Sequence, residues 1–222
     1  DGPYAMGQAD WDKMKLDDLA EWYRPHLTRV SELLAPSASV YLWNTAAGWA
    51  RIDPVMRGLG WTFRRLIVWD KANPAGLLFA ENAGMFGEQS EYCGVYTRGT
   101  PFFTTNGGPS NLWRASHQTW GRERLKSGIP GVALGGTTDW EQPLHACQKP
   151  LAFAERMIRA STRPGERVLV PFGGTNREAV VCEWLARTSP DEARGFDACE
   201  LNADGKDYIG PVLRQIAGED VR

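Results

Sequence analysis

The sequence predicts an α/β fold with a mainly parallel sheet and helices on both faces. Short apolar runs alternate along the chain with segments that have helical periodicity. A strand, a glycine turn and a helix follow one another near the C-terminal end. A chain of 222 residues, 42% hydrophobic and 23% charged, is typical of one soluble domain with a substantial core.

In the N-terminal half we expect two helices and three strands. Apolar spacing predicts a helix over 17–35, which Pro25 should kink or restart. Asp53-Pro54, a capping residue followed by proline, predicts a short helix that runs to Leu59. Strands are predicted over 39–44, 61–69 and 91–98, and a Gly/Asn-rich segment over 72–90.

The C-terminal part should continue the alternation around one strand-turn-helix unit. Its elements are expected to be a helix over 150–162, strands over 168–170 and 195–201, and helices over 176–187 and 205–217. Gly173-Gly174 forms the predicted loop between strand and helix. Glycines let a ligand approach the backbone, and the helix N-terminus offers free N–H groups. On its own, such a turn also serves packing in many α/β proteins.

Composition excludes several classes of protein. No run approaches 18 apolar residues and no signal-peptide pattern occurs, so neither a membrane span nor secretion is expected. The net charge of −2 argues against a generic nucleic-acid coat, although a local basic patch could still bind DNA. The cysteines form no CxxC pair, which favours buried single thiols, a reducing cytoplasm and no metal site; they are Cys93, Cys147, Cys182 and Cys199.

Three motifs occur in a fixed order: Asp1-Gly2-Pro3-Tyr4, then Gln148-Lys149-Pro150, then the run from Pro164 through Val168-Leu169-Val170-Pro171-Phe172 to Gly174. This order resembles the amino-methylating DNA methyltransferases of the permuted (β) class. The resemblance extends from residue 1 to about 216 and implies a Rossmann-like S-adenosylmethionine-dependent fold. It also implies a catalytic half over 1–98, a target-recognition segment over 99–145 and a cofactor-binding half over 146–222.

By this resemblance, the first motif is catalytic. The Asp1 carboxylate and the Gly2 carbonyl would each accept one N–H of an exocyclic amine and so localise its lone pair toward the methyl donor. Tyr4 would stack on a base swung out of the duplex, and Pro3 would fix the turn. From its composition alone, the tetrapeptide is also an ordinary turn. The family usually has proline where Gly2 stands, and the initial Asp favours adenine N6 over cytosine N4.

The second and third motifs are expected to bind S-adenosylmethionine. Glu200, at a strand end, can accept the ribose hydroxyls, as in other nucleotide-binding folds. From the residues alone, Glu200 is equally a solvated acid, and Lys149 is a surface residue before a helix. The residues that the resemblance assigns to the cofactor are Lys149, Pro171, Phe172, Gly173, Gly174, Thr175 and Glu200.

Besides Gly2, three residues in and beside the glycine loop depart from the family pattern. Val170 stands where an acid is usual, and Asn176-Arg177 stand where glycine and threonine are usual. Asparagine tolerates positive φ, whereas a cation is unfavourable at a helix N-terminus. These changes leave open a subunit with weak or silent catalysis that binds DNA or an active partner. An unrelated nucleotide-binding enzyme is a further alternative.

The segment over 99–144 has low periodicity and is the candidate for DNA recognition. Basic residues interleaved with Trp113 and Trp120 suit phosphate contacts with stacking or base-edge reading, although a solvated basic loop anchored by two tryptophans has the same pattern. The candidate DNA-binding residues are Arg114, His117, Arg122, Arg124 and Lys126.

The sequence thus favours a cytoplasmic, bacterial or phage-encoded enzyme that acts on double-stranded DNA, alone, as a homodimer or with a partner subunit. Because motifs of this type follow a strand and Asp1 has none before it, we expect the natural chain to begin earlier.

Overall fold

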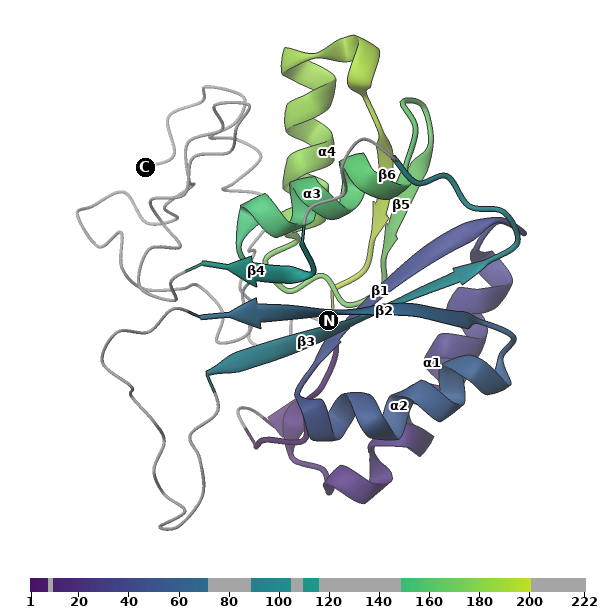
Figure 1. Ribbon diagram of the computed structural model, residues 1–222, viewed down its shortest axis with the longest axis vertical. Helices are drawn as coiled ribbons and strands as arrows, with labels where there is room; N and C mark the ends of the chain where they lie inside the picture. Colours follow the sequence, from purple (N-terminus) through teal and green to yellow (C-terminus); the bar gives the residue numbers. More distant parts are fainter. Residues whose placement is uncertain (8–9, 72–88, 105–109, 116–148, 201–222) are drawn as a thin grey trace, which may run out of the picture. The chain divides into compact units, whose positions relative to one another are not determined.

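The computed structural model describes residues 1–7, 10–71, 89–104, 110–115 and 149–200 (Figure 1). They belong to two compact units. Unit 1 takes its described residues from 1–101 and 105–118, and unit 2 takes them from 102–104 and 119–222. Within these ranges, no helix is both long and apolar enough to cross a membrane. The predicted helix over 205–217 and most of the predicted recognition segment lie outside the described residues.

Unit 1 contains a four-stranded sheet in the order β1-β3-β2-β4 (Figure 1). Strand β3 runs antiparallel to both of its neighbours, and β4 runs parallel to β2. The sheet of this unit is therefore mixed, whereas the sequence predicted a mainly parallel sheet. Antiparallel neighbours can be joined without a helical crossover. The strands are β1 (Ala38–Asn44), β2 (Thr62–Asp70), β3 (Ser90–Arg98) and β4 (Leu112–Arg114).

The first helix of unit 1 follows the predicted periodicity. The 3₁₀ turns η1 (Asp10–Asp12) and η2 (Leu16–Asp18) precede α1 (Leu19–Leu33). α1 continues through Pro25 as one helix, so the predicted restart is wrong. Pro25 is exposed, and on that face water can donate to the backbone carbonyl one turn earlier, which has no N–H partner at proline.

The second helix begins earlier than the sequence suggested. α2 (Ala46–Gly58) has Thr45 as its N-cap, and the Thr45 hydroxyl accepts the Gly48 N–H at 3.0 Å. Asp53 instead faces the sheet, where its carboxylate accepts the Tyr96 hydroxyl at 3.0 Å. Burial, together with this carboxylate, raises the pKa of Tyr96. The Asp53-Pro54 pair therefore lies inside a helix and does not start one.

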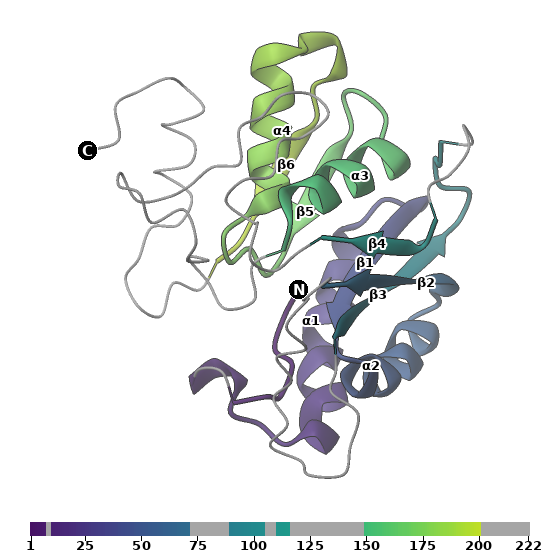
Figure 2. The same ribbon diagram turned by 60° about the vertical axis from the view of Figure 1, so that its left-hand side comes forward.

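Unit 2 contains a parallel strand pair with two helices, which lie side by side in Figures 1 and 2. The elements are α3 (Leu151–Ser161), β5 (Arg167–Val170), α4 (Arg177–Thr188), the turn η4 (Pro190–Glu192) and β6 (Gly195–Ala198). They agree with the predicted alternation within a few residues. Apolar side chains from both helices form the core: Leu151, Ala154, Ile158, Val180, Val181, Trp184 and Leu185, with Cys182.

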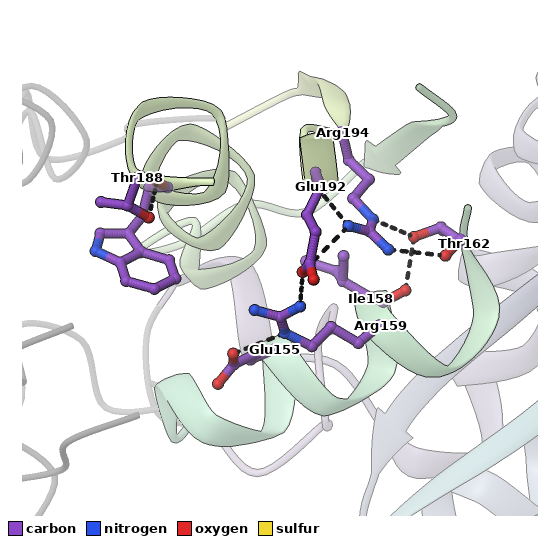
Figure 3. A network of polar contacts seen from close by, with 8 residues as sticks. Glu155, Ile158, Arg159, Thr162, Thr188, Glu192 and Arg194 are labelled. Carbon is purple, nitrogen blue, oxygen red and sulfur yellow. Dashed lines mark hydrogen bonds and ion pairs between the residues drawn. The ribbon is translucent and has the colours of Figure 1, made fainter. Parts of the chain in front are cut away.

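A polar network joins the end of α3 to the connection before β6 (Figure 3). Arg159 bridges Glu155, at 2.8 Å, and Glu192. The buried Arg194 donates to the hydroxyl and the carbonyl of Thr162, at 3.3 and 3.2 Å. Burial, with the nearby Arg159 cation, lowers the pKa of Arg194. The network therefore fixes the end of α3 against the connection that leads into β6.

Candidate functional site

Three buried side chains hold the Asp1–Tyr4 turn, and the first of them is Asp12. Its Oδ1 accepts the backbone N–H groups of Tyr4 and Ala5, at 2.7 and 2.8 Å, and its Oδ2 accepts that of Met6 at 3.0 Å. Ala5 has a φ of 59°, a conformation that a residue other than glycine adopts only when its surroundings hold it there. One carboxylate thus fixes the backbone on the C-terminal side of the turn.

Tyr23 and Asn44 fix the turn from its other side. The Tyr23 hydroxyl and the Asn44 side-chain amide both donate to the Pro3 carbonyl, each at 3.1 Å. Both side chains are buried, Tyr23 in α1 and Asn44 at the end of β1. Because the Pro3 carbonyl has two fixed donors, the peptide that follows Gly2-Pro3 has a single orientation.

The same tyrosine explains the glycine at position 2. A Cβ built on Gly2 would lie 2.5 Å from the Tyr23 hydroxyl oxygen, closer than van der Waals contact allows. Any larger residue at this position, including the proline expected from the resemblance, would require Tyr23 to move. Gly2 is therefore matched to a buried tyrosine.

Tyr4 lies with its hydroxyl between two carboxylates. The hydroxyl is 2.7 Å from Oδ1 of Asp1 and 3.1 Å from Oε2 of Glu91. The Tyr4 side chain is only 5% exposed, so stacking on a base requires neighbouring groups to move aside. Sequence reasoning did not identify Glu91, which lies at the start of β3 and pairs with Lys71 at 2.6 Å.

The glycine loop of unit 2 is held by its backbone. Cys199 N donates to Val170 O at 2.9 Å and Gly173 N donates to Cys199 O at 2.8 Å, which extends the parallel pairing beyond β5 and β6. Gly174 has a φ of 52°, and a Cβ there would meet no atom within 4 Å. The loop therefore leaves open space beside its backbone, as a bound ligand would need.

The three departures from the family pattern have different structural outcomes. Asn176 is the N-cap of α4 with φ 47° and ψ 49°, as expected for a residue that replaces glycine. Val170 and Arg177 are both buried, and Arg177 occupies the first position of α4. A cation there opposes the positive end of the helix dipole.

The predicted cofactor residues that the structure describes all belong to unit 2. The Glu200 carboxylate accepts the Gly174 N–H, which places this acid beside the glycine turn. Thr175 and Lys149 are buried and Pro171 and Phe172 are partly buried. The interpretation of Lys149 as a surface residue is therefore wrong. Lys149 directly precedes α3, whose N-cap is Pro150.

The structure separates the predicted DNA-binding segment into core and surface residues. Trp113 is buried in β4, with its ring centroid 6.3 Å from that of Trp43, so it is a core residue and no stacking platform. Arg114 is 71% exposed and pairs with Asp70 at 2.8 Å. The other candidates, with Trp120, lie outside the described residues: His117, Arg122, Arg124 and Lys126.

The cysteines differ from one another. Cys93 and Cys182 are buried as predicted, whereas Cys199 is exposed, and Cys147 lies outside the described ranges. Burial raises the pKa of the Cys182 thiol to about 12. Cys199 directly follows β6, and its side chain is exposed although its backbone still pairs with Val170 and Gly173.

Comparison with known families identifies the chain. A family model described as DNA methylase, of the N6/N4 type, matches residues 1–211. The chain belongs to this DNA methylase family. The resemblance inferred from the three motifs is thereby confirmed.

Individual relatives are similar over most of the chain. The type II methyltransferase M1.MboII of Moraxella bovis is 26% identical, over 97% of this chain and 88% of that protein. M2.DpnII of Streptococcus pneumoniae is 24% identical, over 82% of this chain and 66% of that protein.

Solved structures confirm the Rossmann-like methyltransferase fold. The M1.HpyAVI complex with S-adenosylmethionine superposes with a TM-score of 0.61 at 17% identity, covering 89% of this chain and 82% of that one. The cytosine-N4-specific PvuII DNA methyltransferase superposes with a TM-score of 0.61 at 13% identity, covering 96% and 82%.

Proposed function

We propose that the chain transfers a methyl group from S-adenosylmethionine to the exocyclic N6 of an adenine flipped out of double-stranded DNA. The observation that carries this proposal is the fixed Asp1–Tyr4 turn. Asp12, Tyr23 and Asn44 hold its backbone on both sides, so the Asp1 carboxylate and the Gly2 carbonyl belong to a pre-organised segment. An ordinary surface turn does not need three buried polar side chains to fix it.

The chain's own residues would prepare the amine. Its lone pair is delocalised into the purine ring, and acceptance of one N–H by Asp1 and the other by the Gly2 carbonyl would localise it on nitrogen. When bound, S-adenosylmethionine would supply an electrophilic methyl group to this nitrogen, with its thioether as the leaving group, and one amine proton would leave to solvent. Tyr4 would provide the flat face that holds the base.

Unit 2 fits this cofactor in two respects. The open backbone at Gly174 and the positive end of the α4 dipole suit a polar ligand, and Glu200 lies beside the glycine turn to accept ribose hydroxyls. Val170 supplies no carboxylate, so we expect cofactor binding to rely on Glu200 and the loop. The buried Lys149, before α3, is the proposed contact near the methionine end.

Two alternatives have specific support. The similarity to a cytosine-N4-specific enzyme favours cytosine N4 as the second candidate acceptor. The buried Val170 and Arg177 favour a subunit that keeps the fold but binds the cofactor weakly. The relatives named type II methyltransferases support a role in site-specific DNA modification.

The test is transfer of labelled methyl groups to unmethylated duplex DNA, followed by identification of the modified nucleoside. We expect N6-methyladenine from the unchanged chain and none from Asp1→Ala. Asp10→Ala, which removes an exposed aspartate of η1, is the control and should keep full activity. N4-methylcytosine as the product would replace adenine by cytosine. Full activity of Asp1→Ala would reject the assigned site.

Calorimetric titration with S-adenosylmethionine separates the enzyme from the silent subunit. One-to-one binding with methyl transfer supports the proposal. A folded chain that binds DNA but neither binds the cofactor nor methylates DNA would instead support the alternative of a silent subunit.

A further inference from the structure

The Tyr4 side chain offers a hydroxyl group as well as the flat face of its ring. Its hydroxyl lies 2.7 Å from Asp1 and 3.1 Å from Glu91, both carboxylates. A phenol carries one proton, so its hydroxyl can make a full-strength hydrogen bond with only one of these acceptors at a time. The two distances show that the bond to Asp1 is the shorter in this structure.

Glu91 is held in place independently of Tyr4. Its Oε1 pairs with Lys71 Nζ at 2.6 Å, and the side chain is only 12% exposed. Lys71 N also donates to Gln89 O at 3.0 Å, which joins the ends of β2 and β3 next to this pair. The second carboxylate is therefore a fixed acceptor, with Oε2 directed at the Tyr4 hydroxyl.

Tyr4 is held as well, so exchange between the acceptors needs little movement. Asp12 fixes its backbone N–H at 2.7 Å, and its side chain is buried. Rotation of the O–H bond, with a shift of a few tenths of an ångström, turns the hydroxyl from Asp1 to Glu91. No change in the fold is required.

This exchange matters for the proposed reaction, on which the inference rests. A hydrogen bond from the phenol draws electron density from the Asp1 carboxylate and weakens it as an acceptor for the substrate amine. We propose that the Tyr4 hydroxyl turns to Glu91 when the amine enters, and that Glu91 is thereby a positioning residue for methyl transfer. Glu91 acts through Tyr4 and has no contact with the base in this proposal.

A double-mutant cycle tests this route. The variants are Tyr4→Phe, which keeps the ring and removes the hydroxyl, Glu91→Ala, and the two combined. The measurement is the single-turnover rate of methyl transfer at saturating S-adenosylmethionine and DNA. We expect Glu91→Ala to lower this rate about tenfold, because the hydroxyl then stays on Asp1, with the KM for DNA changed less than about twofold. In the Tyr4→Phe background, Glu91→Ala should have no further effect.

Glu155→Ala is the matched control. Glu155 is also an ion-paired carboxylate, 10% exposed, but it lies in α3 with Arg159 as its partner. We expect Glu155→Ala to leave the rate unchanged. A similar loss of rate in Glu91→Ala and Glu155→Ala would point to lost stability and would overturn the positioning role of Glu91. Glu91→Gln keeps the volume and one acceptor oxygen, and should give the same pattern with a smaller amplitude, which preserves the test if Glu91→Ala does not fold.

The outcomes separate this inference from the function on which it rests. A full Glu91→Ala effect in the Tyr4→Phe background, or no effect in either background, would overturn the hydroxyl exchange while methyl transfer by the unchanged chain stands. Absence of methyl transfer by the unchanged chain would reject the proposed function and the exchange with it.

Discussion

The Asp1–Tyr4 turn of unit 1 and the Pro171–Asn176 loop of unit 2 are held in opposite ways. Side chains from remote segments fix the turn: Asp12 holds three backbone N–H groups, and Tyr23 and Asn44 hold one carbonyl. Backbone pairing beyond β5 and β6 fixes the loop, together with side-chain contacts to Gly174 from the exposed Glu200 and from Asn176.

This difference separates the residues that stabilise the fold from those that are placed to bind a ligand. Buried side chains that fix a turn act on stability and geometry together, so their loss should destabilise unit 1. A loop held by its own backbone can place an exposed acid near a ligand at little cost in stability. Substitutions in the two regions should therefore differ in whether folding or binding changes more.

The largest effect is expected at Asp12. Asp12→Ala leaves three backbone N–H groups without their acceptor, and we expect a loss of about 3 kcal/mol in the free energy of unfolding. Chemical denaturation followed by tryptophan fluorescence measures this. Asp17→Ala removes an exposed aspartate that pairs with Arg51 and should change stability little. Equal losses in both variants would contradict the role given to Asp12.

A smaller effect is expected at the contact of Gly2 with Tyr23. Gly2→Ala should cost about 2 kcal/mol, because its Cβ meets a buried hydroxyl. Tyr23→Phe removes that oxygen together with its hydrogen bond to Pro3. The double variant should be more stable than the sum of the two losses predicts, as thermal unfolding of all three proteins can show. Strict additivity would mean that the contact imposes no constraint.

In unit 2, Glu200→Gln should weaken binding more than folding. Loss of the carboxylate should raise the Kd for S-adenosylmethionine about tenfold, whereas stability should change by less than about 0.5 kcal/mol. Titration calorimetry measures the first quantity and thermal unfolding the second. Asp191→Asn, an exposed acid of η4, serves as the control for charge. A change in stability with unchanged affinity would reverse the roles of the two regions.

The smallest effect on folding is expected at Arg114. The Arg114 side chain is 71% exposed, so its pair with Asp70 is screened by solvent and Arg114→Ala should change stability by less than about 0.5 kcal/mol. If Arg114 contacts a DNA phosphate, affinity should fall and the salt slope of binding should decrease by about one. Adding Arg122→Ala should decrease it further, and Arg29→Ala, an exposed residue of α1, should leave it unchanged. A constant slope in all variants would place the DNA contacts elsewhere.

Local patterns in the sequence predicted most elements because those elements depend on local chemistry. The apolar spacing of α1 and α3 and the position of Asn176 in the left-handed region follow from a few neighbouring residues. The start of α2 was mistaken because two capping signals occur in that segment. Thr45 caps the helix, while Asp53 hydrogen-bonds to Tyr96 on β3, a contact that only the folded sheet creates.

The residues that hold the site were not predicted for the same reason. Asp12, Tyr23 and Asn44 lie in a loop, a helix and a strand, and their convergence on one turn is a tertiary contact. The one available signal was an acid in Asp10-Trp11-Asp12, shortly after the tetrapeptide. Trp113 was misassigned because a tryptophan beside arginines has the same local pattern in a core strand as in a DNA-binding loop.

The position of the three holding residues has a consequence for how such a chain can be cut and rejoined. Asp12, Tyr23 and Asn44 all lie within the first 44 residues, and the backbone contacts that hold the glycine loop lie within 170–199. Neither set of contacts depends on which region comes first along the chain. If the chain is divided between these two stretches, each of the two fragments carries one region with these contacts complete. A circularly permuted chain with the same break keeps both sets of contacts.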